Sequence, residues 1–251
     1  MAFEMIVVAT LWASAVSFVG ISFIFLNERY LRVSITLLAR LAAGALLAAV
    51  FLSLLPSALL GLGPQAAMIA VFAGVVGFFV TEKSIGWHHH HDIHTRGLEA
   101  PLGWRNYIGD GIHNLCDGVA IGSAFLVSQP AGMIATLAVI MHEIPQEIGD
   151  FGLMLRSGFD KQKAIVFNAF SALLLVSGGV GFFAAYYYLL PFVQNLEFYG
   201  MAFACGMFLY IAITDLIPDV HKDTPKGWLH TQLALVLLGI MLIASVAIFV
   251  K

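Results

Sequence analysis

Apolar residues form eight long runs along the chain, separated by short stretches rich in polar residues, proline or glycine. Each run is close to the roughly 20 residues that an α-helix needs to cross about 30 Å of hydrocarbon. The runs are continuous rather than alternating, which excludes the strands of a membrane barrel. The pattern predicts an all-α integral membrane protein with eight transmembrane helices, at about residues 4–26, 34–58, 65–83, 105–127, 131–155, 162–189, 197–217 and 229–250.

The composition agrees with this prediction. Of the 251 residues 60% are apolar and only 11% are charged, and the mean hydropathy is +0.92. A soluble domain carries about 25% charged residues, so these values exclude a soluble enzyme and a nucleic-acid-binding protein. Cys116 and Cys205 both lie within apolar runs, which argues against a disulfide scaffold. We expect residues 1–251 to form a single transmembrane domain, because the eight helices leave nothing for a soluble one.

Basic residues lie almost entirely on one side of the predicted topology. Eleven of the twelve fall in the connections after the first, third, fifth and seventh helices or at the adjoining helix ends, and only Lys251 falls on the other side. Basic residues favour the cytosolic side, so we expect both termini to be extracytoplasmic. The eleven are Arg29, Arg32, Arg40, Lys83, Arg96, Arg105, Arg156, Lys161, Lys163, Lys222 and Lys226.

The longest predicted connection, residues 84–104, is cytosolic in this topology and rich in histidine. Imidazoles in a flexible loop bind Zn²⁺ and other transition metals without needing a fold. We interpret this loop as a site of metal capture, and a merely solvated loop is the alternative. Its histidines, five of the nine in the chain, are His88, His89, His90, His91 and His94.

Ionisable residues are concentrated in the fourth and fifth predicted helices. A charged group at bilayer depth costs about 2.5–3.5 kcal/mol on insertion scales, and no Lys or Arg lies in the central parts of these helices to balance their carboxylates. A bound cation is the simplest balance, and a structural network of paired side chains is the alternative. The residues are Asp110, His113, Asn114, Asp117, His142, Glu143, Gln146, Glu147 and Asp150.

The spacing of these residues gives the cluster a definite shape. His113 and Asp117 are four positions apart and therefore project from one helix face, and His142 and Gln146 repeat this spacing. The residue after each histidine extends the polar face sideways. Imidazole together with carboxylate suits Zn²⁺, Fe²⁺ or Mn²⁺ better than Na⁺ or Ca²⁺, so the pattern predicts a transition-metal site between the two helices.

These two segments resemble those of the ZIP metal-ion transporter family. HNLCDGVAIG at 113–122 matches the family's HNxxDGxAIG, and HEIPQEIGD at 142–150 matches its HExPHE followed by GD. Weaker similarities lie at 42–56, 168–174 and 206–219. The resemblance implies an alternating-access, elevator-like carrier with a 3+2+3 arrangement of helices, helices four and five carrying the metal site, and a dimer as the usual assembly.

The resemblance also implies which residues bind metal, in two overlapping sites. Gln146 stands where relatives have His or Glu, and Asn168 stands where some have Glu. The two sites then contain only two carboxylates, which neutralise a single divalent ion, so we expect one tightly held ion. The primary site comprises His113, Asp117, His142 and Gln146, and the neighbouring site comprises Asn114, Asp117, Glu143, Gln146 and Asn168.

Further acidic residues lie on the cytosolic side of these sites. In the predicted topology the fourth helix runs outward and the fifth runs inward, so their remaining carboxylates lie nearer the cytosol than the histidines. Another acidic pair lies at the cytosolic end of the seventh helix. We predict an exit path through Asp110, Glu147, Asp150, Asp215, Asp219 and His221.

Together these observations predict a transporter, not an enzyme, that carries divalent transition-metal ions into the cytosol. Zn²⁺ is favoured, with Fe²⁺, Mn²⁺ and Cd²⁺ as alternatives, because a mixed site accepts all of them to some degree. We expect metal ions, the lipid bilayer and a second copy of the chain as partners, no prosthetic group and no nucleic acid. The short chain favours a bacterial inner membrane.

Two rival functions are compatible with part of the pattern. A metal-exporting antiporter also places His and Asp four apart in a span, but that class usually has six spans and a cytosolic domain. An intramembrane metalloprotease would use HEIPQ as its HExxH motif, but Gln146 replaces the second histidine ligand and Pro145 would distort the helix that presents the pair.

Overall fold

The computed structural model describes residues 1–22, 28–86, 100–189, 192–218 and 229–249. All regular structure in these ranges is helical, which confirms the predicted all-α class. The elements are α1 (Ala2–Ser17), α2 (Val19–Ser22), α3 (Glu28–Ala49), the π-helical turn η2 (Val50–Leu54), α4 (Leu55–Leu62), α5 (Pro64–Ile85), α6 (Ala100–Val127), α7 (Gln129–Arg156), α8 (Lys161–Leu189), α9 (Leu196–Ile211), the π-helical turn η3 (Ala212–Leu216) and α11 (Leu229–Phe249).

Five helical segments in the described part of the chain are long and apolar enough to cross a membrane. Helix α1 is apolar but shorter. Helices α6 and α7 are 28 residues each, and their polar side chains set them apart from the five. The predicted eight-span arrangement therefore stays a prediction. The five segments are Val33–Leu62, Pro64–Ile85, Lys161–Leu189, Leu196–Leu216 and His230–Phe249.

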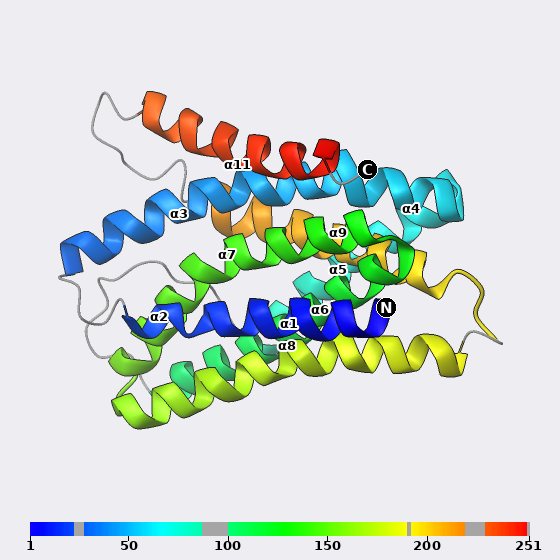
Figure 1. Ribbon diagram of the computed structural model, residues 1–251. Coiled ribbons are helices and arrows are strands. Elements are labelled where there is room, and N and C mark those ends of the chain that lie inside the picture. The colour runs from blue at the N-terminus through cyan, green and yellow to red at the C-terminus, as the bar shows by residue number, and fades with distance from the viewer. Residues whose placement is uncertain (23–27, 87–99, 190–191, 219–228, 250–251) are drawn as a thin grey trace.

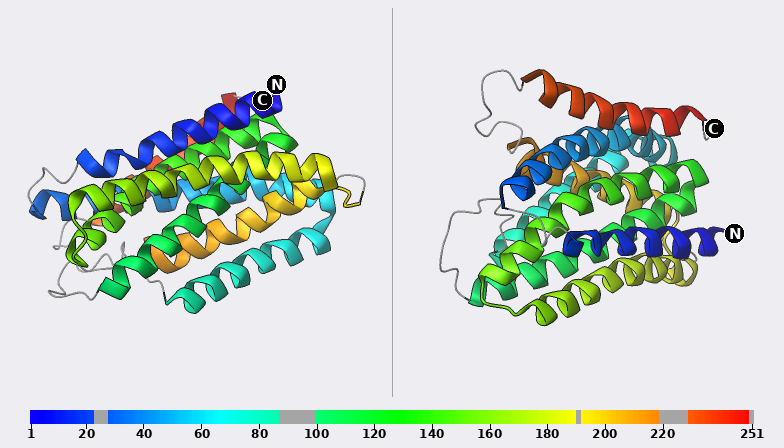
Figure 2. Two further views of the ribbon diagram at one scale, coloured as in Figure 1. Left: turned by 90° about the horizontal axis from the view of Figure 1, so that it is seen from below. Right: turned by 60° about the vertical axis from the view of Figure 1, so that its left-hand side comes forward.

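Successive long helices run in alternating directions, and the first residue of α1 and the last residue of α11 lie at the same end of the bundle (Figure 1). Helices α3 and α11 lie on one side and α1 and α8 on the other, with α6 and α7 between them (Figures 1 and 2). Helix α9 packs against α5 and also against α6. The two helices that carry the ionisable residues are thus enclosed by neighbours.

Reciprocal glycine contacts hold α6 against α8. A Cβ atom on Gly118 would lie 2.0 Å from the carbonyl oxygen of Leu175, and one on Gly178 would lie 2.1 Å from that of Leu115. Such distances leave room only for hydrogen, so the two backbones touch directly. Small residues allow this close approach in membrane helix pairs.

The same reciprocal glycine contacts occur in two other helix pairs. Between α5 and α9, Cβ atoms on Gly74 and Gly206 would lie 2.1 and 2.0 Å from backbone carbonyl oxygens of the opposite helix. Between α3 and α11, Gly44 and Gly239 make the equivalent contacts, at 2.1 Å each. We call α6/α8, α5/α9 and α3/α11 the glycine-locked pairs.

Two π-helical turns interrupt the helices next to the centre of the bundle. The first, η2, comes just before Pro56, which has no backbone N–H and crowds the carbonyl group of the preceding turn. The hydroxyl of Ser57 donates to the carbonyl oxygen of Ser53 at 2.9 Å, which satisfies one of the backbone groups there. The second, η3, continues α9 and includes Asp215. Such turns often occur at functional sites.

The structure differs from the expected helix ends at the first predicted segment and at one arginine. The segment 4–26 is interrupted at Phe18, because α1 ends at Ser17 and α2 begins at Val19. Arg40 was counted among the basic residues of loops and helix ends, but it lies well inside α3 and is only 1% exposed. Its side chain is therefore buried inside the protein rather than exposed in a loop.

Candidate metal centre

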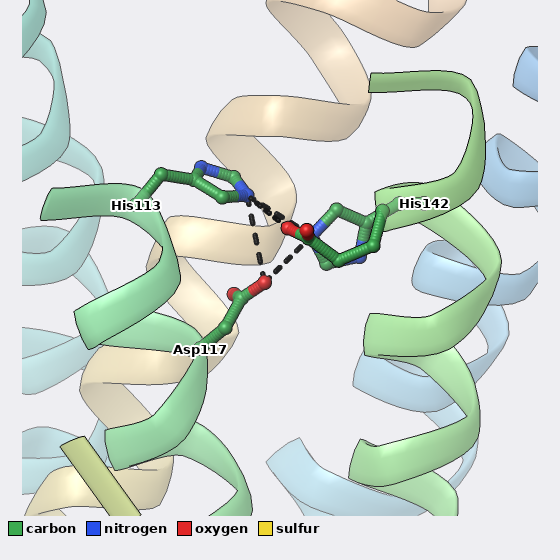
Figure 3. A group of neighbouring side chains, drawn as sticks. His113, Asp117 and His142 are labelled. Carbon is green, nitrogen blue, oxygen red and sulfur yellow. Dashed lines mark hydrogen bonds and ion pairs between the residues drawn. The ribbon is translucent and has the colours of Figure 1, made fainter. Parts of the chain in front are cut away.

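Four side chains from α6 and α7 converge at one point in the bundle (Figure 3). His113 and Asp117 come from α6, and His142 and Glu143 come from α7. None is more than 1% exposed. In the part of the chain that the structure describes, they form the one group of at least three His, Cys, Asp or Glu side chains able to share an ion, with ligand atoms within 4.8 Å of one another. We call these four residues the metal cluster.

The distances within the metal cluster match tetrahedral coordination. The Nε2 atoms of His113 and His142 lie 3.1 Å apart. An Asp117 oxygen lies 3.5 and 3.0 Å from these two nitrogens, and a Glu143 oxygen lies 3.3 and 3.8 Å from them. Ligand atoms of a tetrahedral zinc ion with bonds of 2.0–2.1 Å lie about 3.3 Å apart. Five edges of the tetrahedron therefore already have nearly the right length.

The helix backbone fixes the orientation of one imidazole. The Nδ1 atom of His142 lies 2.9 Å from the carbonyl oxygen of Ala138, one turn earlier in α7. A carbonyl oxygen only accepts, so Nδ1 carries the proton and donates it. The Nε2 atom then presents its lone pair to the other members of the cluster, as a metal ligand must.

The carboxylates of the metal cluster lack hydrogen-bond donors. None of the four carboxylate oxygens of Asp117 and Glu143 makes a hydrogen bond within the described residues, and their close contacts are to the imidazole nitrogens. Burial of ionised carboxylates without compensation is costly. A divalent cation at the centre would offset this cost.

The three amide side chains of the predicted sites, Gln146, Asn114 and Asn168, are also buried. Gln146 is 7% exposed, and its amide nitrogen has no hydrogen-bond partner in the described structure. The amide nitrogen of Asn114 donates to a carboxylate oxygen of Asp110 and to the hydroxyl of Ser171, at 3.1 Å each. The amide of Asn168 donates to the carboxylate of Glu147. The structure thus brings Glu143, which the resemblance places in the neighbouring site, next to both histidines of the primary site.

The structure describes four of the six residues of the predicted exit path. Asp110, Glu147 and Asp150 are all buried, at 2%, 0% and 4% exposed, and lie near one another. Asp215 lies in η3 and accepts a hydrogen bond from the hydroxyl of Thr214 at 3.0 Å. Asp219, His221 and the loop histidines His88, His89, His90, His91 and His94 lie outside the described residues.

Sequence reasoning did not single out four residues around the cluster. Ser171 holds Asn114, and Asn106 approaches Asp150. The sequence could have identified these two residues. Asn106 precedes Asp110 by four residues and Ser171 follows Asn168 by three, so each shares a helix face with a predicted site residue. Phe78 and Phe208 pack against the two imidazoles, and nothing in the sequence distinguishes them from other apolar residues.

Comparison with known proteins decides the family. The family model described as "ZIP Zinc transporter" matches residues 88–247, which is more than half of the chain and includes the metal cluster. The chain belongs to the ZIP zinc transporter family. This confirms the resemblance carried by the two motifs, and with the apolar helices it makes the chain a multi-pass membrane protein of a family of transporters rather than enzymes.

The chain is also similar in sequence to individual zinc transporters of the ZIP family. The chain is 35% identical to zinc transporter ZIP6 of Homo sapiens over 158 residues, which are 60% of this chain and 20% of that protein. It is 32% identical to human zinc transporter ZIP10 over 189 residues, 65% of this chain and 22% of that protein. It is 33% identical to zinc transporter ZIP13 of Pongo abelii over 224 residues, 83% of this chain and 66% of that protein.

The chain thus spans about a fifth of the length of the ZIP6 and ZIP10 relatives. All three relatives are animal proteins, and they lend no support to the expectation of a bacterial membrane.

Proposed function

We propose that the protein transports divalent transition-metal ions, with Zn²⁺ favoured, across a membrane through the metal cluster of α6 and α7. The observation that carries this proposal is the near-tetrahedral set of buried imidazole and carboxylate atoms, 3.0–3.8 Å apart. Two carboxylates neutralise a divalent ion, and two imidazoles favour a transition metal over Mg²⁺ or Ca²⁺. Fe²⁺, Mn²⁺ and Cd²⁺ are further candidate cargoes for the same donor set.

We propose that one ion is held tightly and that Gln146, Asn114 and Asn168 assist its passage. The amide oxygens of Asn114 and Asn168 have no hydrogen-bond partner in the described part of the chain, so both are available to a passing cation. Asp110, Glu147 and Asp150 would accept the ion next. They are buried, and they lie toward the start of α6 and the end of α7, because Asp110 precedes His113 on α6 and both Glu147 and Asp150 follow His142 on α7.

We propose that this end of the bundle faces the cytosol and that transport is inward. The last turns of α5 and α7 carry Lys83 and Arg156, and α8 begins with Lys161 and Lys163 nearby. Basic residues favour the cytosolic side. Both termini would then be extracytoplasmic, the eight predicted helices would all span, and Asp215, Asp219, His221 and the loop histidines would lie on the cytosolic side. The family resemblance adds a 3+2+3 arrangement and a homodimer.

Uptake by liposomes tests the proposal. The protein is reconstituted with a zinc-sensitive dye inside, and Zn²⁺ is added outside. We expect zinc-dependent influx that His113→Ala and Asp117→Ala abolish. His230→Ala is the matched control, because His230 lies exposed on α11, and it should transport like the wild type. No influx by the wild type, or equal influx by the His113→Ala and Asp117→Ala variants, would overturn the proposal.

A further inference from the structure

Two phenyl rings cover the imidazoles of the metal cluster. The ring centroid of Phe78 lies 5.5 Å from that of His113, with 70° between the planes. The ring centroid of Phe208 lies 5.8 Å from that of His142, with 65° between the planes. Both contacts are edge-to-face, and Phe208 is fully buried while Phe78 is 4% exposed. Each histidine of the cluster is therefore packed against an aromatic ring.

Neither ring belongs to the helices that carry the metal ligands. Phe78 lies on α5 and Phe208 on α9, which form one of the glycine-locked pairs. Phe78 also packs against Tyr210 of α9 at 5.8 Å, and the hydroxyl of Tyr210 donates to the carboxylate of Glu82 on α5. The two rings are thus fixed to each other through α5 and α9. Helix α9 passes directly behind the cluster in Figure 3.

We infer that Phe78 and Phe208 are positioning residues for the transported ion. They hold the imidazoles with their Nε2 atoms toward the cluster, and they keep water away from the ion, because a phenyl ring neither binds a metal nor accepts a strong hydrogen bond. The two contacts join α5 and α9 to α6 and α7. If α5 and α9 shift together relative to α6 and α7, both phenyl rings move away from the imidazoles, and water ligands can reach the ion. This inference rests on the proposed function.

Cobalt spectroscopy tests the inference on the purified protein. Four-coordinate Co²⁺ absorbs visible light much more strongly than five- or six-coordinate Co²⁺, so its spectrum reports whether water has entered the site. All variants are made in a background with the five loop histidines replaced by alanine, which leaves the cluster as the site observed. Phe79→Ala is the matched control, because Phe79 is the next residue on α5, is 46% exposed and packs against Tyr210 rather than an imidazole.

We expect Phe78→Ala and Phe208→Ala to weaken Co²⁺ binding about tenfold, as loss of an outer-shell partner typically does, and to lose most of the visible absorption. Phe79→Ala should retain both. Wild-type affinity and spectrum in both alanine variants would overturn the inference. Should those variants fail to fold, Phe78→Leu and Phe208→Leu keep most of the buried volume, and wild-type behaviour in them would equally overturn it. Failure of the parent protein to bind Co²⁺ would instead contradict the metal centre itself.

Discussion

The Nε2 atoms of His113 and His142 lie 3.1 Å apart although the two residues are 29 positions apart in the chain and on different helices. Two helices bring them together, and the hydrogen bond from His142 to the carbonyl oxygen of Ala138 aims one of the nitrogens at the other. Without an ion, this separation requires one of the two nitrogens to carry a proton and donate it to the other. An ion bound by both atoms would hold them at a similar separation through their lone pairs.

The first prediction concerns which α7 side chain completes the primary site. Glu143 contacts both imidazoles, so Glu143→Gln should weaken the binding of the first Zn²⁺ at least tenfold, which is about the loss seen when an outer-shell group is removed. Gln146→Ala should weaken it much less. Competition with a chromophoric zinc chelator measures both affinities. The reverse order would favour the ligand set implied by the family motif.

The second prediction concerns the number of ions. Asp117 and Glu143 together neutralise one divalent ion, and a second ion would remain uncompensated in a medium of low dielectric constant. Isothermal calorimetry of protein whose loop histidines are replaced should therefore give one tight site per chain. Gln146→Glu adds a third carboxylate and should create a second measurable site. An unchanged stoichiometry in that variant would count against the charge argument.

The third prediction links metal to stability. The buried carboxylates of the cluster repel one another in the metal-free protein, so Asp117→Asn should raise Tm in the presence of a chelator. Zinc binds the folded state and should raise the Tm of the wild type, whereas the variant should gain little. Glu4→Gln removes an exposed carboxylate and serves as the control. Equal zinc-induced shifts in wild type and Asp117→Asn would contradict the prediction.

The fourth prediction concerns the contact between α6 and α8. In Gly178→Ala the new Cβ atom would meet the carbonyl oxygen of Leu115 at 2.1 Å, so the helices must separate. We expect a loss of about 1–3 kcal/mol of stability, the usual cost of overpacking, measured by thermal unfolding in detergent. Gly181→Ala lies on the same helix with no atom within 4 Å of its new Cβ and should leave Tm nearly unchanged.

Apolar run length predicted the all-α class, and helical spacing predicted that His113 and Asp117 share one face of their helix. His113 and Asp117 had to share a face once α6 was recognised as a helix, and the absence of Lys and Arg nearby indicated a cation. The family resemblance placed Gln146 in the primary site and Glu143 in the neighbouring one. The sequence alone did not show that Glu143 lies next to both histidines, because that depends on how α6 and α7 are rotated against each other when they pack.

Other features depend on contacts between distant segments. In the sequence, Phe78 and Phe208 look like any other apolar residues of their helices. Only the packing of α5 and α9 against α6 and α7 shows that they contact the histidines. The predicted helix at about 34–58 already includes Arg40, but the burial of its side chain depends on the helices that pack around α3. The sequence indicates that Pro56 disturbs the helix, because its ring crowds the carbonyl group of the preceding turn. Whether the helix responds with a kink or with a π-helical turn depends on the helices packed around it.

The central claim is that His113, Asp117, His142 and Glu143 together hold the ion. X-ray absorption at the zinc edge measures this directly on protein whose loop histidines are replaced by alanine and to which one equivalent of Zn²⁺ is added. We predict four nitrogen or oxygen ligands at about 2.0–2.1 Å, with the outer-shell scattering of two imidazoles that falls to one in His113→Ala. A shell of six oxygen ligands without imidazole scattering, or a spectrum that His113→Ala leaves unchanged, would contradict the account.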